Sequence, residues 1–236
     1  MRKLIEGIVE FREQRLPELE LRFQELAKGQ NPDTLFISCS DSRVVPSLLM
    51  SSDPGELFIM RNVGNLMPPG TRDGDSTGDL SEASAIEYAV LVLNVRNIII
   101  CGHSGCGAMQ AVLSGDSLAD APNLAQWLGL AACALRRLRD EGALDSSIPP
   151  DDQLSQWNVL VQIEHLLTYP IVQQKVETGQ LQLSGWWFDI GKGDMYAYEP
   201  DKRRYELIDR NEGERLIGSL HLADGKPCCI STTAPQ

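Results

Sequence analysis

The chain has 236 residues, of which 42% are hydrophobic and 23% are charged, as in an ordinary globular protein. Its formal net charge of −12 argues against a nucleic-acid partner and against docking on an anionic membrane, because both bind through clustered lysine and arginine. No segment approaches the roughly 20 apolar residues of a membrane span, so we expect a cytoplasmic protein whose cysteines are thiols.

The first 28 residues have the apolar spacing of an amphipathic helix. Leu4 and Ile8 recur at helical intervals among glutamates, which distinguishes this segment from the unbroken apolar core of a signal peptide. Pro17 stands where a second helix should begin, because the first helical turn tolerates proline. We expect residues 1–30 to form a helical arm that packs on a partner subunit.

Residues 31–236 show the order of elements expected for a single α/β domain. Apolar runs at 34–38, 56–60 and 97–101 predict buried strands of a parallel sheet. Residues 81–94, between the last two runs, predict a largely buried helix. Strand-helix-strand order indicates a parallel sheet with right-handed crossovers.

The second half of the chain predicts helices followed by a hairpin. Residues 121–140 and 152–174 have helical patterns, and two later strands, 181–190 and 194–199, are separated by a turn containing two glycines. The expected fold is therefore α/β, with a mainly parallel central sheet flanked by helices, an N-terminal helical arm and antiparallel edge strands near the C-terminus.

Metal-binding residue types follow two of the predicted strands. Cys39 comes after the first strand, and His103 and Cys106 come after the third. If these strands are neighbours, their carboxyl ends bring the three side chains together. Thiolates and imidazole suit Zn²⁺, and three protein ligands leave a position for water, as in catalytic sites. Spacing alone leaves open a structural zinc site with another cysteine, or a Cys–His pair held by core packing.

Asp41 and Arg43 extend this cluster. Positions 39, 41 and 43 alternate, so an extended segment would point all three side chains to the same side. A bidentate pair with Arg43 would keep Asp41 ionised, and an ionised carboxylate only accepts hydrogen bonds. Such a carboxylate beside a metal could orient a bound hydroxide. An ordinary surface ion pair is the alternative.

The stretch from Cys39 to Val44, followed by His103 to Gly107, closely resembles the two signature motifs of the β-class carbonic anhydrases. The similarity continues between these motifs and covers roughly residues 4–199. The resemblance implies one Zn²⁺ per subunit on Cys39, His103 and Cys106. It also implies the reversible hydration of CO₂ to bicarbonate and a proton by attack of zinc-bound hydroxide, with Asp41 and Arg43 as catalytic residues.

The same resemblance implies a substrate pocket. Gln30, Phe58 and Tyr88 occupy places that match the pocket of the plant-like subgroup, near a partner subunit, and Gly107, the last residue of the second motif, is also assigned to the pocket. A homodimer or dimer-based tetramer is implied, with Asp41 held off the metal. Two thiolates donate more charge than the three histidines that give a water pKa of about 7 in other carbonic anhydrases, so an alkaline optimum is expected.

Alternative functions remain within or outside this family. Hydrolases of CS₂ or COS resemble it and share its zinc ligands, and a noncatalytic zinc-binding protein is also conceivable. Gly102, Gly105 and Gly107 do not have the order of a dinucleotide-binding fingerprint. His165 and His221 are expected to be core or surface residues, not proton carriers. Recruitment to a carboxysome is compatible with the sequence, but no appended targeting tail indicates it.

Overall fold

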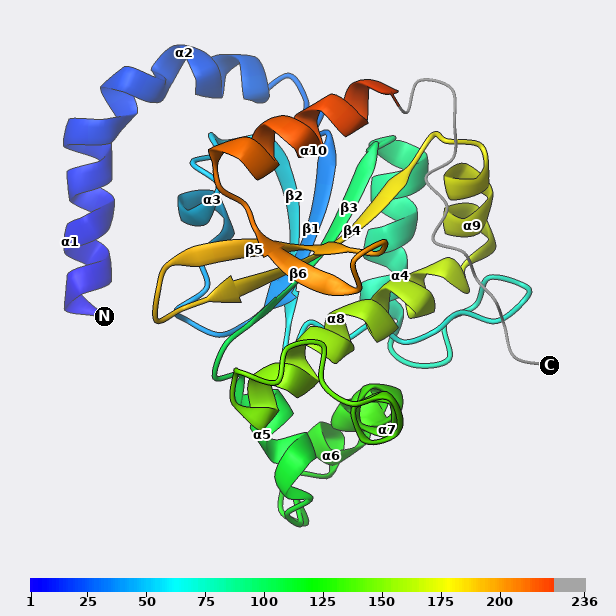
Figure 1. Cartoon of the computed structure of the whole chain (residues 1–236). Helices are drawn as coiled ribbons and strands as arrows, with labels where there is room; N and C mark the ends of the chain where they lie inside the picture. The colour runs from blue at the N-terminus through cyan, green and yellow to red at the C-terminus, as the bar shows by residue number, and fades with distance from the viewer. Residues whose placement is uncertain (223–236) are drawn as a thin grey trace.

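The computed structural model describes residues 1–222, and its centre is a six-stranded sheet flanked by helices (Figure 1). The strand order is β2-β1-β3-β4-β5-β6, with the first four strands parallel and the last two antiparallel. The predicted fold class is confirmed. The strands are β1 (Thr34–Cys39), β2 (Leu57–Asn62), β3 (Asn97–His103), β4 (Gln182–Asp189), β5 (Asp194–Glu199) and β6 (Arg204–Leu207).

Helices connect and cover these strands. The α-helices are α1 (Arg2–Glu10), α2 (Leu16–Leu26), α3 (Pro46–Leu49), α4 (Leu80–Glu87), α5 (Gly107–Ser114), α6 (Pro122–Leu128), α7 (Ala132–Glu141), α8 (Pro150–Leu167), α9 (Pro170–Glu177) and α10 (Arg210–Leu222). Three further helical segments are η1 (Phe11–Arg15), η2 (Tyr88–Val92) and η3 (Gly129–Ala131). None of the described helices combines the length and apolarity needed to cross a membrane.

The main core lies between the sheet and helices α4, α8 and α9. Ile37 and Ile100 from the strands are fully buried there with Ile86 and Val159 from the helices. These strands are apolar on both faces, because Phe36 and Ile99 point into a second core on the opposite side. Helices α5, α6 and α7 form a third core with the first half of α8, in green below the sheet in Figure 1.

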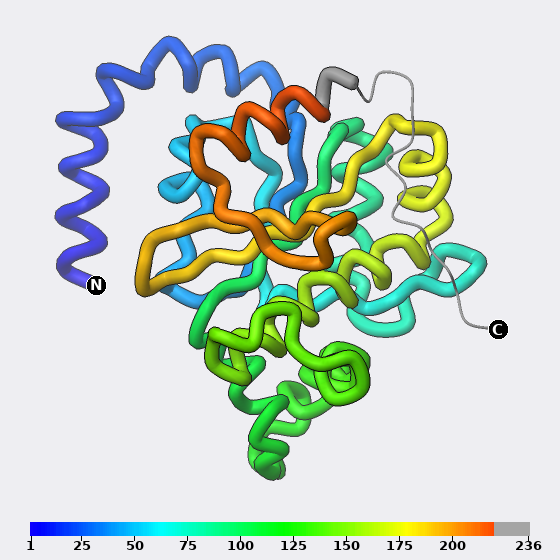
Figure 2. Tube along the Cα trace, viewed as in Figure 1, coloured from blue at the N-terminus to red at the C-terminus, as the bar shows by residue number. Residues whose placement is uncertain are grey.

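The N-terminal arm leaves the body of the protein. Helices α1 and α2, joined through η1, contain no buried residue, and Figure 2 shows them reaching away from the sheet. Pro17 lies in the first turn of α2, as predicted. The arm therefore exists as a structural unit, although its expected partner contact is not tested by a single chain.

Several element boundaries differ from the predictions. The helix expected over 152–174 is two helices, because Pro170 cannot continue α8 and instead begins α9. The helix expected over 121–140 is likewise divided, at Gly129. The helix expected over 81–94 is only half buried, since Leu91 and Val92 are exposed.

Two elements near the C-terminus were not predicted. Strand β6 extends the hairpin of β4 and β5, and α10 follows it. The hairpin itself is confirmed, with Trp187 buried in the core at 3% exposure. Residues 223–236 lie outside the described residues.

Candidate metal centre

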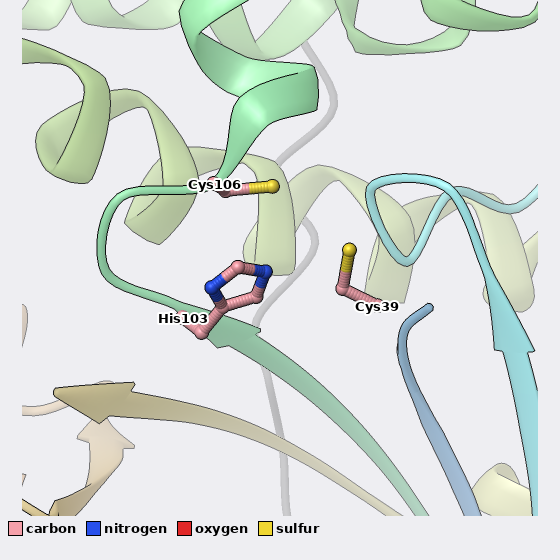
Figure 3. Close-up of side chains that lie close together, drawn as sticks. All are labelled: Cys39, His103 and Cys106. Atoms are coloured by element: carbon pink, nitrogen blue, oxygen red, sulfur yellow. The ribbon is translucent and has the colours of Figure 1, made fainter. Parts of the chain in front are cut away.

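Cys39, His103 and Cys106 converge on one point, as the sequence predicts. Their ligand atoms lie within 4.8 Å of one another, and all three residues are buried. Strands β1 and β3 pair in parallel, so Cys39 and His103, each the last residue of its strand, meet at the same edge of the sheet. Cys106 precedes the first residue of α5. Figure 3 shows the two sulfur atoms and the imidazole facing a common space.

The Nε2 atom of the His103 ring is available to bind a metal ion. Its Nδ1 lies 2.9 Å from the Ser104 carbonyl oxygen, which accepts the ring N–H and leaves the lone pair on Nε2. Nε2 is buried and has no hydrogen-bond partner among the described residues. Because buried polar atoms are normally satisfied, this nitrogen fits a metal ligand better than a core histidine.

The thiols of Cys39 and Cys106 lie close together and differ in pKa. The neighbouring Cys106 thiol outweighs burial and lowers the pKa of Cys39 to about 4. The same contact, together with burial, raises the pKa of Cys106 far above its usual value. The Gly64 N–H also donates to Cys39 Sγ at 3.4 Å. Zinc binding requires both sulfur atoms to be deprotonated, and the lowered pKa of Cys39 favours this at one of them.

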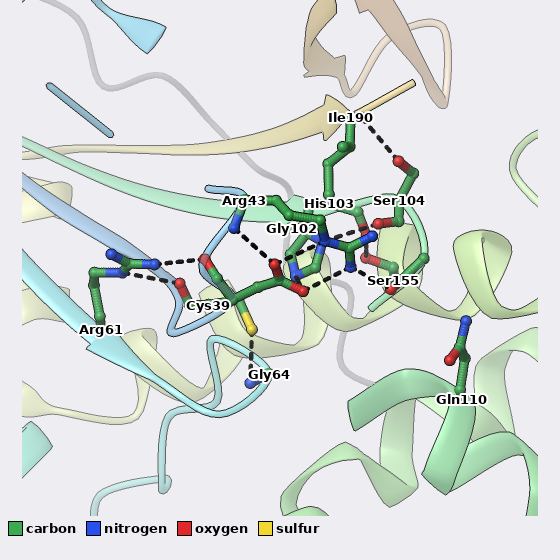
Figure 4. Close-up of polar contacts among 12 residues, drawn as sticks. Cys39, Arg43, Arg61, Gly64, Gly102, His103, Ser104, Gln110, Ser155 and Ile190 are labelled. Atoms are coloured by element: carbon green, nitrogen blue, oxygen red, sulfur yellow. Dashed lines mark hydrogen bonds and ion pairs between the residues drawn. The ribbon is translucent and has the colours of Figure 1, made fainter. Parts of the chain in front are cut away.

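Asp41 and Arg43 form the expected bidentate pair beside the cluster. Arg43 Nε donates to Asp41 Oδ1 at 2.9 Å, and Nη2 donates to Oδ2 at 2.7 Å (Figure 4). These hydrogen bonds hold the pKa of Asp41 well below its usual range, so the carboxylate stays ionised. Asp41 Oδ2 lies 4.0 Å from His103 Nε2. The carboxylate thus stands at the edge of the metal cluster.

The segment that carries this pair is a turn, and the extended conformation expected for it is wrong. The backbone N–H of Arg43 donates to Asp41 Oδ1 at 2.9 Å, and the N–H of Val44 donates to the Asp41 carbonyl at 3.0 Å. Aspartate favours such turns because its side chain binds the backbone two residues on. Arg43 also donates to the Gly105 carbonyl at 2.9 Å, which ties the two motifs together.

Arg61 supports the site from the neighbouring strand. Its Nε donates to the Cys39 carbonyl at 3.0 Å and its Nη2 to the Asp41 carbonyl at 2.7 Å (Figure 4). Sequence reasoning did not assign a role to Arg61, because this residue lies between the two motifs. Its role follows from the pairing of β1 with β2, which places Arg61 opposite Ser38 and therefore close to Cys39.

The four expected pocket residues do not lie together. Gly107 directly follows Cys106, and the rings of Phe58 and Tyr88 contact each other with centroids 5.7 Å apart. Phe58, however, is four residues before Asn62, the partner of Cys39 in the sheet, so it lies about 13 Å along β2 from the metal cluster. Gln30 is exposed before β1, at the amino end of the sheet.

His165 takes no part in this cluster. His165 is largely enclosed, with Nδ1 2.7 Å from the Met67 carbonyl, in agreement with the expected structural role. The side chain of His221 lies outside the described part of the structure.

Comparisons with known proteins agree on one family. A family model described as carbonic anhydrase matches residues 34–195. A carbonic anhydrase of Synechococcus elongatus is 42% identical over 99% of this chain and 84% of its own length. One from Pseudomonas aeruginosa is 40% identical over 92% of this chain and 96% of its own.

Solved structures of similar proteins lead to the same family. The β-carbonic anhydrase CcaA has a TM-score of 0.79 and 36% identity, covering 88% of this chain and 98% of its own. A tetrameric β-carbonic anhydrase from Sordaria macrospora has a TM-score of 0.71 and 28% identity, covering 83% of this chain and 95% of its own.

Proposed function

The chain belongs to the β-class carbonic anhydrases, and from this premise we propose how its residues achieve the reversible hydration of CO₂ to bicarbonate and a proton. The observation that carries the proposal is the convergence of Cys39, His103 and Cys106 next to the ionised carboxylate of Asp41. No feature of the described residues favours CS₂ or COS as the substrate.

Cys39, His103 and Cys106 are proposed to hold one Zn²⁺ through two sulfur atoms and Nε2. The donor set fits this metal, because two sulfur atoms and a ring nitrogen without another partner among the described residues lie within 4.8 Å of one another. When bound, zinc supplies an acidified water molecule as the nucleophile for CO₂. Three protein ligands leave one coordination position open for it.

Asp41 is proposed to orient that nucleophile, as an acceptor of its proton in a hydrogen bond. The carboxylate suits this role because the Arg43 guanidinium keeps it ionised and therefore unable to donate. Arg43 engages both carboxylate oxygens and the Gly105 carbonyl. These hydrogen bonds hold Asp41 at the edge of the cluster. They support a site in which Asp41 stays off the metal, as expected for the plant-like subgroup.

Gln30, Phe58 and Tyr88 are proposed to line the substrate pocket of a partner subunit. Within their own chain they lie toward the opposite end of the sheet from the metal cluster. Tyr88 is 42% exposed, contacts Phe58 of the edge strand β2, and is followed by Leu91 and Val92, at 59% and 64% exposure. An exposed apolar surface of this kind is typical of a subunit interface. We propose a dimer, or a tetramer built from dimers.

The chain is proposed to consist of a catalytic domain, residues 31–236, and a helical arm, residues 1–30. The arm is proposed to pack on a partner subunit. Leu4, Ile8 and Leu21 are 67%, 68% and 79% exposed, although their spacing is that of a helix with an apolar face.

We also propose a cytoplasmic enzyme, because the described cysteines are free thiols, as expected in a reducing compartment.

Stopped-flow CO₂ hydration by the zinc-loaded protein between pH 7 and 9 tests the proposal. We expect hydration well above the buffer rate, and removal of zinc by a chelator should abolish it. Zinc-loaded protein with no hydration activity would contradict the proposal. Hydrolysis of COS or CS₂ by such a protein would instead assign it to the related hydrolases.

A further inference from the structure

Helix α8 presents a buried polar face to the metal centre. Asp152, Ser155, Asn158 and Gln162 are at most 7% exposed, although a helix packed on a sheet normally buries apolar side chains. Their spacing of three and four residues places them on one side of the helix. Ser155 Oγ donates to the His103 carbonyl at 2.9 Å, and Asp152 Oδ1 accepts from the Gly105 N–H at 2.6 Å. This face therefore contacts the segment that carries two of the ligands.

The second half of the polar face holds a different segment, Gly64–Met67. Asn158 Nδ2 donates to the Gly64 carbonyl at 3.0 Å, and Gln162 Oε1 accepts from the Met67 N–H at 2.8 Å. A hydrogen bond of 2.9 Å from Gln162 Nε2 to Asn158 Oδ1 joins the two side chains. Both are fully enclosed, at 1% and 0% exposure, so the pair binds both ends of this segment without competition from water.

Gly64 connects this pair to the metal cluster. Its N–H donates to Cys39 Sγ at 3.4 Å, the contact drawn in Figure 4. Its φ is +81°, and a Cβ at this position would lie 2.9 Å from Ala108 Cβ, so there is room only for glycine. The peptide that carries the N–H is also held from its other side, because Trp127 Nε1 donates to the Val63 carbonyl at 2.8 Å.

We propose that Asn158 and Gln162 are positioning residues that keep the Gly64 N–H on the Cys39 sulfur. A hydrogen bond to a thiolate withdraws electron density from it, so the pair sets how much charge this sulfur donates to the metal. The role depends on Cys39 being a metal ligand, as proposed above. It concerns the electronic state and placement of that ligand, and not contact with the substrate.

Cobalt substitution measures this effect apart from activity. In Co²⁺-loaded Asn158→Ala and Gln162→Met, the sulfur-to-cobalt charge-transfer absorption should move to longer wavelength, because a thiolate without its hydrogen bond gives up charge more readily. The zinc dissociation constant, measured by competition with a chelator, should rise about tenfold or more, because the sulfur is no longer held in place for the metal. Gln156→Ala is the matched control. Gln156 is 3% exposed on the same helix, and its Oε1 has no hydrogen-bond partner among the described residues.

The outcomes separate this inference from the ligand assignment. Absence of a sulfur-to-cobalt band in the wild-type protein would refute Cys39 as a ligand. A wild-type band that stays in place in both variants, with unchanged zinc affinity, would overturn the positioning role. So would equal shifts in Gln156→Ala. If one variant does not fold, the other decides. If neither folds while Gln156→Ala does, the pair serves the fold itself and the inference is also overturned.

Discussion

Asp41 is not part of the metal cluster, but its carboxylate lies 4.0 Å from His103 Nε2, and we propose that it orients the nucleophile. In Asp41→Asn we expect zinc to stay bound, because the three ligand atoms are untouched. The CO₂ hydration kcat/KM should fall about 10- to 100-fold, since the amide can donate a hydrogen bond and no longer holds the nucleophile's proton as a pure acceptor. Metal analysis and stopped-flow kinetics on the same sample measure both quantities.

Asp145→Asn is the matched control for this substitution. Asp145 is an aspartate whose pKa is lowered by hydrogen bonds from Ser147, so the same change of charge is made away from the metal centre. Its activity should remain that of the wild type. Loss of zinc from Asp41→Asn would contradict the expected role and would make Asp41 a metal ligand.

His165 should make the stability of the metal-free protein depend on pH. Burial lowers the pKa of its ring from the usual 6.5, against the hydrogen bond to the Met67 carbonyl. Below pH 6.5 the unfolded chain therefore binds a proton that the folded protein does not. The contribution of His165 to the free energy of unfolding is therefore complete above pH 6.5, and it is lost as the pH falls from 6.5 toward the lowered pKa.

Urea unfolding of the metal-free protein at pH 7.5 and 5.5 measures this contribution. His165→Asn keeps an amide N–H near the place of Nδ1 and removes the titrating ring, so the stability difference between the two pH values should shrink. An equal difference in both proteins would show that His165 has no share in it.

For single residues, ligand chemistry predicted that Cys39, His103 and Cys106 form a metal cluster, because each follows a strand that the apolar pattern reveals. The ion pair of Asp41 and Arg43 was also predicted, but for a wrong reason: a turn brings them together, not strand alternation. Arg61 and the buried polar residues of α8 had no local signal, since their contacts span 20 residues or more.

Among the elements, α8 packs against the sheet more closely than a side chain at Gly102 would allow. A Cβ on Gly102 of β3 would lie 2.8 Å from Val159 Cγ2 and 3.0 Å from Ser155 Oγ. Gly102→Ala should therefore push the helix from the strand and lower the free energy of unfolding by about 1–3 kcal/mol. Chemical denaturation measures this change.

Gly129→Ala provides the comparison. Gly129 has helical backbone angles, and a Cβ there would meet no atom within 4 Å. This substitution should be neutral or stabilise by up to about 1 kcal/mol. Equal stabilities of the two variants would mean that α8 adapts to the extra methyl group and that the close approach does not matter.

Strands and helices were predicted correctly where a local pattern in the sequence reveals them, and missed where they depend on contacts with other elements. Strands β1 and β3 were predicted because parallel strands buried on both faces are continuously apolar. Strand β2 was found by its apolar run, but the expectation that it is buried is wrong: it is an edge strand, and Ile59 is 38% exposed. Strand β6 was missed because it is short and half exposed, and it exists only by pairing with β5. The break between α8 and α9 required weighing Pro170 above a helical pattern that continues on both sides.

For the whole molecule, the sheet order decides which residues share a site. One chain gathers the metal ligands at the carboxyl ends of β1 and β3 and leaves Phe58 and Tyr88 near the other end of the sheet. No local pattern in the sequence gives these separations, because they follow from strand register. If the pocket is completed by a second subunit, the functional unit is a dimer with two shared sites.

A mixed dimer tests this arrangement. His103→Ala removes a proposed metal ligand, and Tyr88→Ala removes a proposed pocket residue that is 42% exposed and therefore tolerant of truncation. We expect each homodimer to have low activity. Co-expression with two different affinity tags isolates the dimer that contains one subunit of each kind. In a symmetric dimer with shared sites, the intact metal cluster of one subunit meets the intact Tyr88 of the other, so about half of the wild-type activity should return.

The complementary pairing distinguishes shared sites from a general effect of mixing. A dimer of His103→Ala with Cys106→Ala lacks a ligand in both metal clusters, so it should stay inactive whichever subunit supplies the pocket. If each subunit instead used its own Tyr88, the first mixed dimer would also contain no complete site and would be no more active than its parents. Recovery in the first pairing alone therefore requires that Tyr88 act across the interface, as the distance along β2 indicates.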